Sequence, residues 1–232
     1  MERILTLTQF TPAEAERITG ATTVTQRDWR RRGILTKRGE GHARYDLFDL
    51  SEMMALKLLS ERGISLDDAA TVADWCAMGI GYRALLWVNA YEGDHLRTNE
   101  ARGLPEQILE LGEQEVALLR KAANEARVQL PEGLESRARW GDKGSWLAQQ
   151  VYREKFKTGV VPGELFIWWA NGDHLFHDSF DQARGDMTTD DERLAGPALL
   201  LDLQSLASAL LTKSGRALVH VEFPDLPEKP DA

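Results

Sequence analysis

The chain has 232 residues, of which 43% are hydrophobic and 28% charged, and its formal net charge is −9 at pH 7. These proportions are those of a globular protein and exclude a wholly disordered chain, and no apolar run reaches the ~20 residues that a bilayer-spanning helix needs. A single cysteine, Cys76, excludes an internal disulfide and a cysteine metal site, and the first residues show no secretory pattern, so we expect a cytoplasmic protein that does not enter membranes.

The charge is distributed unevenly along the chain. Residues 1–47 hold nine Lys and Arg against six Asp and Glu, a net charge of +3, which leaves −12 for the remainder. Residues 17–45 alone carry a net charge of +6. This asymmetry predicts a basic head, suited to nucleic acid, on an acidic body.

The first two predicted elements are short helices with clear end signals. Thr11-Pro12-Ala13-Glu14 is a capping box with proline at the first helical position, and it opens a helix over 12–19 that stops at Gly20. The same pattern at Thr23-Val24-Thr25-Gln26 opens a second helix, which ends at Gly33, where glycine adopts the left-handed conformation that favours a helix end.

A hairpin and two further helices follow. Glycines between Ile34-Leu35 and Ala43-Arg44-Tyr45 predict a β-hairpin. Apolar spacing and polar caps then predict helices over about 50–62 and from Ser65 to near Gly79. The order helix, turn, helix, hairpin, helix, helix is typical of a winged helix-turn-helix.

This part of the chain, about residues 4–78, resembles the DNA-binding domain of MerR-type transcription regulators. The residues that carry the resemblance are, in the family's order, Ala13-Glu14-Ala15, Ile18-Thr19-Gly20, Thr25-Gln26-Arg27-Asp28-Trp29-Arg30-Arg31-Arg32-Gly33-Ile34-Leu35, Arg44-Tyr45 before Asp49-Leu50, and Arg62-Gly63-Ile64-Ser65-Leu66-Asp67-Asp68-Ala69. Two positions depart from the family. Asp28 stands where an aromatic is usual, and Gln26 stands at an apolar position, so we expect Val24 to supply the core contact instead.

The second helix and the hairpin hold the candidate DNA contacts. A helix fits the major groove, where Arg27 or Arg30 is suited to guanine and Gln26 to adenine, while the hairpin cations are suited to phosphates. Tyr45 either adds a hydroxyl contact or packs in the core. The full candidate set is Thr23, Thr25, Gln26, Arg27, Arg30, Arg31, Lys37, Arg38, His42, Arg44 and Tyr45. The alternative is that the run of arginines at 30–32 is a solvated helix end whose cations balance the helix dipole.

Beyond residue 80 the pattern becomes mixed. The expected elements are a strand over 84–88, a turn at 91–94 with a returning strand at 95–98, a helix over about 105–130, a polar linker over 135–143, a helix over 145–156, strands over 165–169 and 173–180, a loop over 181–195, a helix over 197–212 and a strand over 216–223. The 105–130 helix carries a stripe of Val116, Leu119, Ala123, Ala126 and Leu130, and is our dimerisation candidate.

The aromatic segment 165–180 leaves more than one interpretation open. The cluster of Asp173, His174, His177 and Asp178 suggests a metal site, but residues three apart on a strand point to opposite faces, so no metal or other cofactor is expected. A two-residue turn at Asn171-Gly172 would place Trp169 opposite His174 and Phe166 opposite His177. The aromatics themselves fit a sheet buried on both sides, a subunit interface or a pocket for an apolar effector.

These observations predict an α+β protein with a winged-helix head (residues 1–80), a mixed α/β body for dimerisation or sensing (81–224) and a flexible tail (225–232). The resemblance implies a regulator that binds specific double-stranded DNA, with a small-molecule or protein effector at the body. We expect a homodimer, because one head of this size makes too few base contacts for high specificity. No phosphate loop, HExxH sequence or nucleophile elbow indicates an enzyme. The alternatives are an excisionase-like or packaging factor of a mobile element, and a protein-interaction module in which Asp28 marks lost DNA binding.

Overall fold

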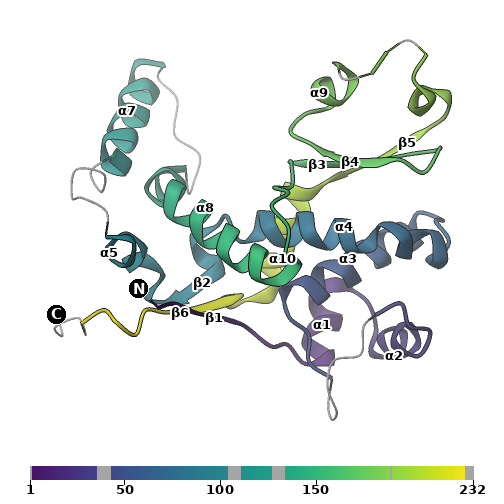
Figure 1. Ribbon diagram of the computed structural model, residues 1–232, viewed down its shortest axis with the longest axis horizontal. Helices are drawn as coiled ribbons and strands as arrows, with labels where there is room; N and C mark the ends of the chain where they lie inside the picture. Colours follow the sequence, from purple (N-terminus) through teal and green to yellow (C-terminus); the bar gives the residue numbers. More distant parts are fainter. Residues whose placement is uncertain are drawn as a thin grey trace.

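The computed structural model describes residues 2–35, 43–103, 111–126, 134–185, 187–188 and 190–227. The fold is α+β, with helices around two small three-stranded sheets (Figure 1). Its elements in chain order are β1 (Ile4–Leu7), α1 (Pro12–Thr19), α2 (Thr23–Arg31), α3 (Leu47–Glu61), α4 (Leu66–Ala84), η1 (Val88–Ala90), β2 (Tyr91–Gly93), η2 (Asp94–Arg97), α5 (Thr98–Arg102), α7 (Leu111–Ala126), α8 (Leu134–Phe156), β3 (Leu165–Trp169), β4 (His174–His177), α9 (Phe180–Gly185), η3 (Glu192–Ala195), β5 (Ala198–Asp202), α10 (Leu203–Ser214) and β6 (Val219–Glu222).

The helices of the head begin at capped residues, much as predicted. Thr11 and Glu14 form the capping box of α1, and the hydrogen bonds from Thr11 hold the pKa of the Glu14 carboxyl below its ordinary value. Helix α2 begins at Thr23 with Thr22 as its cap. Helix α3 begins at Leu47 rather than at 50, because Asp46 accepts hydrogen bonds from the first turn and so caps the helix earlier than Asp49 would.

Helix α4 is longer than predicted. It continues through Gly79 and Gly81 to Ala84, so the expected strand over 84–88 is wrong, and the chain then forms the η1 turn. Both glycines lie where a neighbouring side chain approaches closely. A Cβ added at Gly79 would lie 2.5 Å from Leu203 Cδ1, and a Cβ added at Gly81 would lie 2.5 Å from the Phe48 ring. Here glycine serves close helix packing rather than helix termination, and the end signal at Gly79 is misleading.

The first sheet joins the two ends of the chain. Its strand order is β1-β6-β2, with β6 antiparallel to β1 and parallel to β2. The short strands β1 and β2 were not predicted, and the expected returning strand over 95–98 is the η2 turn and the start of α5. The predicted last strand is confirmed as β6.

The second sheet has the order β4-β3-β5, and its hairpin differs in register from the prediction. His174 lies opposite Trp168 and His177 opposite Leu165. The turn is longer than the two residues expected, because Trp169 and Asp173 still pair through a 2.9 Å backbone hydrogen bond and Gly172, at φ 93°, completes the loop. The two histidines do lie on opposite faces, since His174 contacts the Trp75 ring and His177 contacts Trp169.

A helical hairpin of α7 and α8 projects beside the first sheet (Figure 1). Of the predicted helix over 105–130 the structure describes Leu111–Ala126, and residues 104–110 and 127–133 lie outside the described ranges. The predicted polar linker over 135–143 is helical instead, within α8, which bends at Gly141. Val116 and Ala123 of the stripe are buried and α7 packs on α8, so these two residues of the dimerisation candidate are used within the chain, and Leu130 lies outside the described residues.

The last part of the chain returns to the head. The predicted helix over 197–212 is a strand, β5, followed by α10, and α9 and η3 occupy parts of the predicted loop over 181–195. Helix α10 packs on α1, α3 and α4, and a single core cluster includes Phe10 and Ile18 of the head together with Leu210 and Val221. The expected boundary at residue 80 falls inside α4, and we retain the division into head and body as a proposal. Among the described residues, no helix is long and apolar enough to cross a membrane.

Candidate nucleic-acid interface

Helix α2 has one buried face and one exposed face. Gln26 and Trp29 are buried against the head, whereas Val24, Arg27 and Arg31 are exposed. In Figure 1 this helix lies at the edge of the molecule, away from both sheets. The exposed face of α2 is therefore accessible to a large partner, and it carries cationic side chains.

Gln26 does not belong to this exposed face, so its assignment to base reading is wrong. Its side chain is 0% exposed, and Nε2 donates to the carbonyl oxygens of Pro12 at 3.0 Å and Ala21 at 2.8 Å. An amide with these two partners ties α2 to the start of α1 and to the turn between the helices. It can stand at an apolar position of the family because its Nε2 finds two partners within the head, although its Oε1 is buried and accepts no hydrogen bond from the described residues.

Val24 is likewise placed differently from the prediction. It is 72% exposed and does not anchor the core, because Gln26 fills that place itself. A branched apolar side chain therefore stands next to Arg27 on the outer surface of α2. Such a side chain is suited to a thymine methyl group.

Asp28, the second departure from the family, has a cationic partner. Arg31 Nη2 lies 2.6 Å from Asp28 Oδ1, one helical turn away. Arg32, which follows the helix, lies 2.7 Å from Asp67 at the start of α4. The carboxylate of Asp28 thus contributes less repulsion toward phosphates than an unpaired one would.

Tyr45 packs in the core rather than facing phosphate. It is 4% exposed, and its backbone pairs with Phe10 in an isolated antiparallel bridge. Burial raises the pKa of the Tyr45 hydroxyl above its ordinary value. The guanidinium of Arg30 lies 6.0 Å from the Tyr45 ring centroid, so Arg30 is partly engaged with the head and Tyr45 is removed from the candidate DNA contacts.

The remaining candidates divide into three groups. Thr23 and Thr25 lie on the first turn of α2, where Thr25 Oγ1 is 2.8 Å from Thr22 Oγ1 and the Thr23 amide donates to Glu16. Arg44 is exposed just before the Phe10–Tyr45 bridge. Lys37, Arg38 and His42 lie outside the described residues, as does the rest of the predicted hairpin tip over 36–42.

Two arginines that sequence reasoning passed over hold the head to the last helix of the chain. Arg17 of α1 donates to the carbonyl oxygens of Lys213 and Ser214 at the end of α10. Arg216 donates to the Gln9 carbonyl and to Glu14 Oε1, each at 3.0 Å, and its guanidinium lies 4.6 Å from the Phe10 ring centroid. No local pattern reveals these contacts, because their partners are about two hundred positions apart in the chain.

The capped α1, the turn held by Gln26 and the outward-facing α2 together define a helix-turn-helix domain of the DNA-binding class. Residues 10–74 match the model of the MerR HTH family regulatory proteins, so this part of the chain is a MerR-like helix-turn-helix domain. The match ends within α4, and the rest of the chain is outside it. No curated protein and no solved structure matches the chain.

Proposed function

We propose that this protein is a transcriptional regulator that binds specific double-stranded DNA through α2, with no catalytic role. The observation that carries the proposal is the exposed cationic face of α2 within a domain that matches a family of DNA-binding regulators. Arg27, which has no ion pair among those the described residues form, is the best placed side chain for a guanine edge. Thr23, Thr25, Arg31 and Arg44, with Lys37, Arg38 and His42 beyond the described residues, are suited to the backbone.

The Asp28–Arg31 pair favours this function over a protein-interaction module that has lost DNA binding. That alternative rested on Asp28 as an unbalanced negative charge at the surface that would face phosphates. The 2.6 Å ion pair supplies the balancing cation from the same helix. The mobile-element alternative keeps the DNA contact, and a bending footprint at a recombination or packaging site without an effect on nearby transcription would favour it.

A homodimer is part of the proposal. One head offers few base contacts, and two-fold pairing doubles the site that is read. Because Val116 and Ala123 are buried against α8, α7 would have to offer its outer face, where Leu118 is 68% exposed. Light scattering behind size exclusion should give the mass of a dimer at micromolar protein, and a monomer at that concentration would contradict this part of the proposal.

Selection of binding sequences from random duplex DNA, with the full chain at moderate salt, tests the function. We expect an enriched motif with two-fold symmetry, and an affinity that falls steeply with salt because only the head attracts phosphates. A folded protein that enriches no sequence would contradict sequence-specific binding.

Arg27→Ala should weaken binding to the selected site by roughly 5- to 150-fold, since one good bidentate base contact contributes about 1–3 kcal/mol. Arg184→Ala is the matched control: this arginine is exposed on α9, far from α2 in Figure 1, and its loss should leave DNA affinity unchanged. Fluorescence anisotropy of a labelled duplex measures both variants. Equal losses in the two variants would indicate general charge attraction instead of a contact by α2.

A further inference from the structure

A cavity of about 470 Å³ opens between the head and the second sheet. Small-molecule sites in proteins commonly have volumes of ~300–1,000 Å³. The cavity is therefore large enough for a compact organic molecule, and it lies apart from the exposed face of α2.

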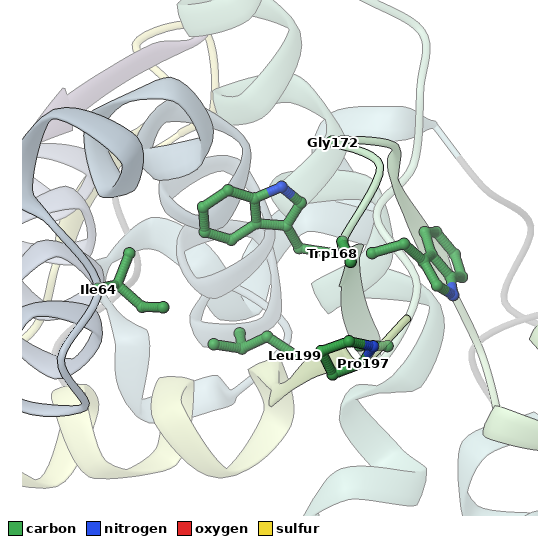
Figure 2. A pocket seen from close by; sticks show the side chains of 8 residues that line it. Ile64, Trp168, Gly172, Pro197 and Leu199 are labelled. Atoms are coloured by element: carbon green, nitrogen blue, oxygen red, sulfur yellow. The ribbon is translucent and has the colours of Figure 1, made fainter. Parts of the chain in front are cut away.

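Two elements form its walls. Trp168 of β3 and Leu199 of β5 are paired across neighbouring strands, so their side chains share one face of the sheet. Ile64 forms the opposite wall from the turn between α3 and α4. Figure 2 shows the indole of Trp168 and the side chain of Leu199 both directed toward Ile64, with Gly172 and Pro197 at the rim.

The packing of the same sheet face explains why the space is not filled. One row along, Phe166 and Leu201 are buried, and Phe176 approaches α4 so closely that a Cβ on Gly79 would lie 3.0 Å from its ring. The second sheet thus packs closely against α4 at Gly79. Toward its tip the hairpin lies over the start of α4, as Figure 1 shows. There His174 contacts the Trp75 ring of α4, while Trp168 and Leu199 line open space beside Ile64.

The lining selects for an uncharged, largely apolar ligand. The described residues that line the cavity include no acidic or basic side chain. A charged molecule would lose its hydration there without gaining an ionic partner. The indole face of Trp168 is suited to stacking on a flat ring, and Leu199 and Ile64 would cover its edges.

We propose that this cavity binds a neutral aromatic small molecule, held between Trp168 and Leu199 of the sheet and Ile64 of the head. The occupant would join the α3–α4 turn, which belongs to the matched helix-turn-helix region, to the body. Its binding would therefore strengthen the contact between the head and the body. The effect of that contact on regulation rests on the proposed function, whereas the binding itself does not. The site is suited to an effector that contacts the head at the α3–α4 turn and not at α2.

Titration of the full chain with N-phenyl-1-naphthylamine, a neutral aromatic probe whose fluorescence rises in apolar sites, tests the binding. We expect saturable binding of one probe per chain. Leu199→Gln should weaken it at least tenfold, and Leu200→Gln should leave it unchanged, because Leu200 is the adjacent residue on β5, is 43% exposed and points to the other face of the sheet. Ile64→Gln supplies an independent wall variant outside the sheet should Leu199→Gln fail to fold.

The charged analogue 1-anilinonaphthalene-8-sulfonate should bind at least tenfold more weakly than the neutral probe. A signal that never saturates, equal losses in Leu199→Gln and Leu200→Gln, or wild-type affinity in a folded Ile64→Gln would each overturn the site. Tight binding of the sulfonate would overturn the assignment of a neutral ligand. These titrations contain no DNA, so a failure here is distinct from a failure to enrich a DNA motif.

Discussion

At the scale of single residues, Gln26 and Arg27 show how neighbours on one helix take opposite roles. Successive residues on a helix point about 100° apart, so Gln26 faces the head while Arg27 faces out. Both were candidates for reading bases, and the sequence pattern alone could not separate them. The distinction lies in the two carbonyl partners that the Gln26 amide finds on Pro12 and Ala21.

Gln26→Met should lower the free energy of unfolding by about 1–3 kcal/mol, because a side chain of similar size removes one buried and one partly buried hydrogen bond and leaves their carbonyl oxygens without these partners. Urea unfolding followed by circular dichroism measures the change. Arg27→Met, on the exposed side, should shift stability by no more than about 0.5 kcal/mol while impairing DNA binding. A stable Gln26→Met that has lost its DNA sequence preference would restore Gln26 to the reading face.

Cys76 should be unreactive in the folded protein. The thiol is 0% exposed on α4, and burial raises its pKa to about 12, so the nucleophilic thiolate is scarce at neutral pH. Ellman's reagent should therefore modify no thiol in the native chain over minutes and the single thiol after denaturation in guanidinium. Rapid stoichiometric reaction of the native protein would show that α4 opens readily.

At the scale of elements, the close packing of α4 sets the geometry of its neighbours. Gly79 allows Leu203 and Phe176 to approach, and Gly81 allows the ring of Phe48 to approach. These two positions hold α10, the second sheet and α3 against one helix. A larger residue at either would have to displace buried side chains that have little room to move.

Gly81→Ala and Gly79→Ala should each destabilise the protein by about 1–2 kcal/mol, since an overpacking cost of about 2–3 kcal/mol at these tight contacts exceeds the roughly 1 kcal/mol that alanine gains over glycine in a helix. Gly185→Ala, at the end of α9, is the control, because an added Cβ there meets nothing within 4 Å. It should be neutral or slightly stabilising in the same urea unfolding measurement. Stabilisation by Gly81→Ala would mean that Phe48 can move aside.

Elements with strong local signals were predictable from the sequence, and those that depend on distant partners were not. Thr11 with Glu14 identified α1, and the apolar run at 165–169 identified β3, because capping and strand patterns are local. The short strand β1 forms only through pairing with β6, and the start of the predicted helix over 197–212 is a strand because it pairs with β3. Leu and Ala favour helices, and tertiary pairing overrides this preference.

At the scale of the whole molecule, the head is built into the rest of the chain. Helix α10 packs on α1, α3 and α4, and Arg17 and Arg216 bridge the head and the end of α10. The division into a basic head and an acidic body could be predicted from the charge along the sequence. The caps located α2, and its arginines then indicated a cationic face. The shared core and the cavity beside Ile64 could not, because they arise from contacts between segments far apart in sequence.

A fragment of residues 1–84 should therefore lack cooperative thermal unfolding, although it contains every helix of the matched domain. It loses the strand partner of β1 and the apolar face of α10, which includes the buried Leu203 and Leu210. Calorimetry and circular dichroism of the fragment beside the full chain check this. A sharp transition close to that of the full chain would show instead that the head folds independently.

The position of β6 in the first sheet has a consequence for biosynthesis. This strand follows every other described element in the chain, yet it lies between β1, which precedes them all, and β2. A ribosome that makes the chain from its N-terminus therefore exposes both outer strands long before their common partner emerges. Chains that stop short of β6 keep two unpaired strand edges, and we expect cellular proteases and chaperones to distinguish them from finished molecules by those edges.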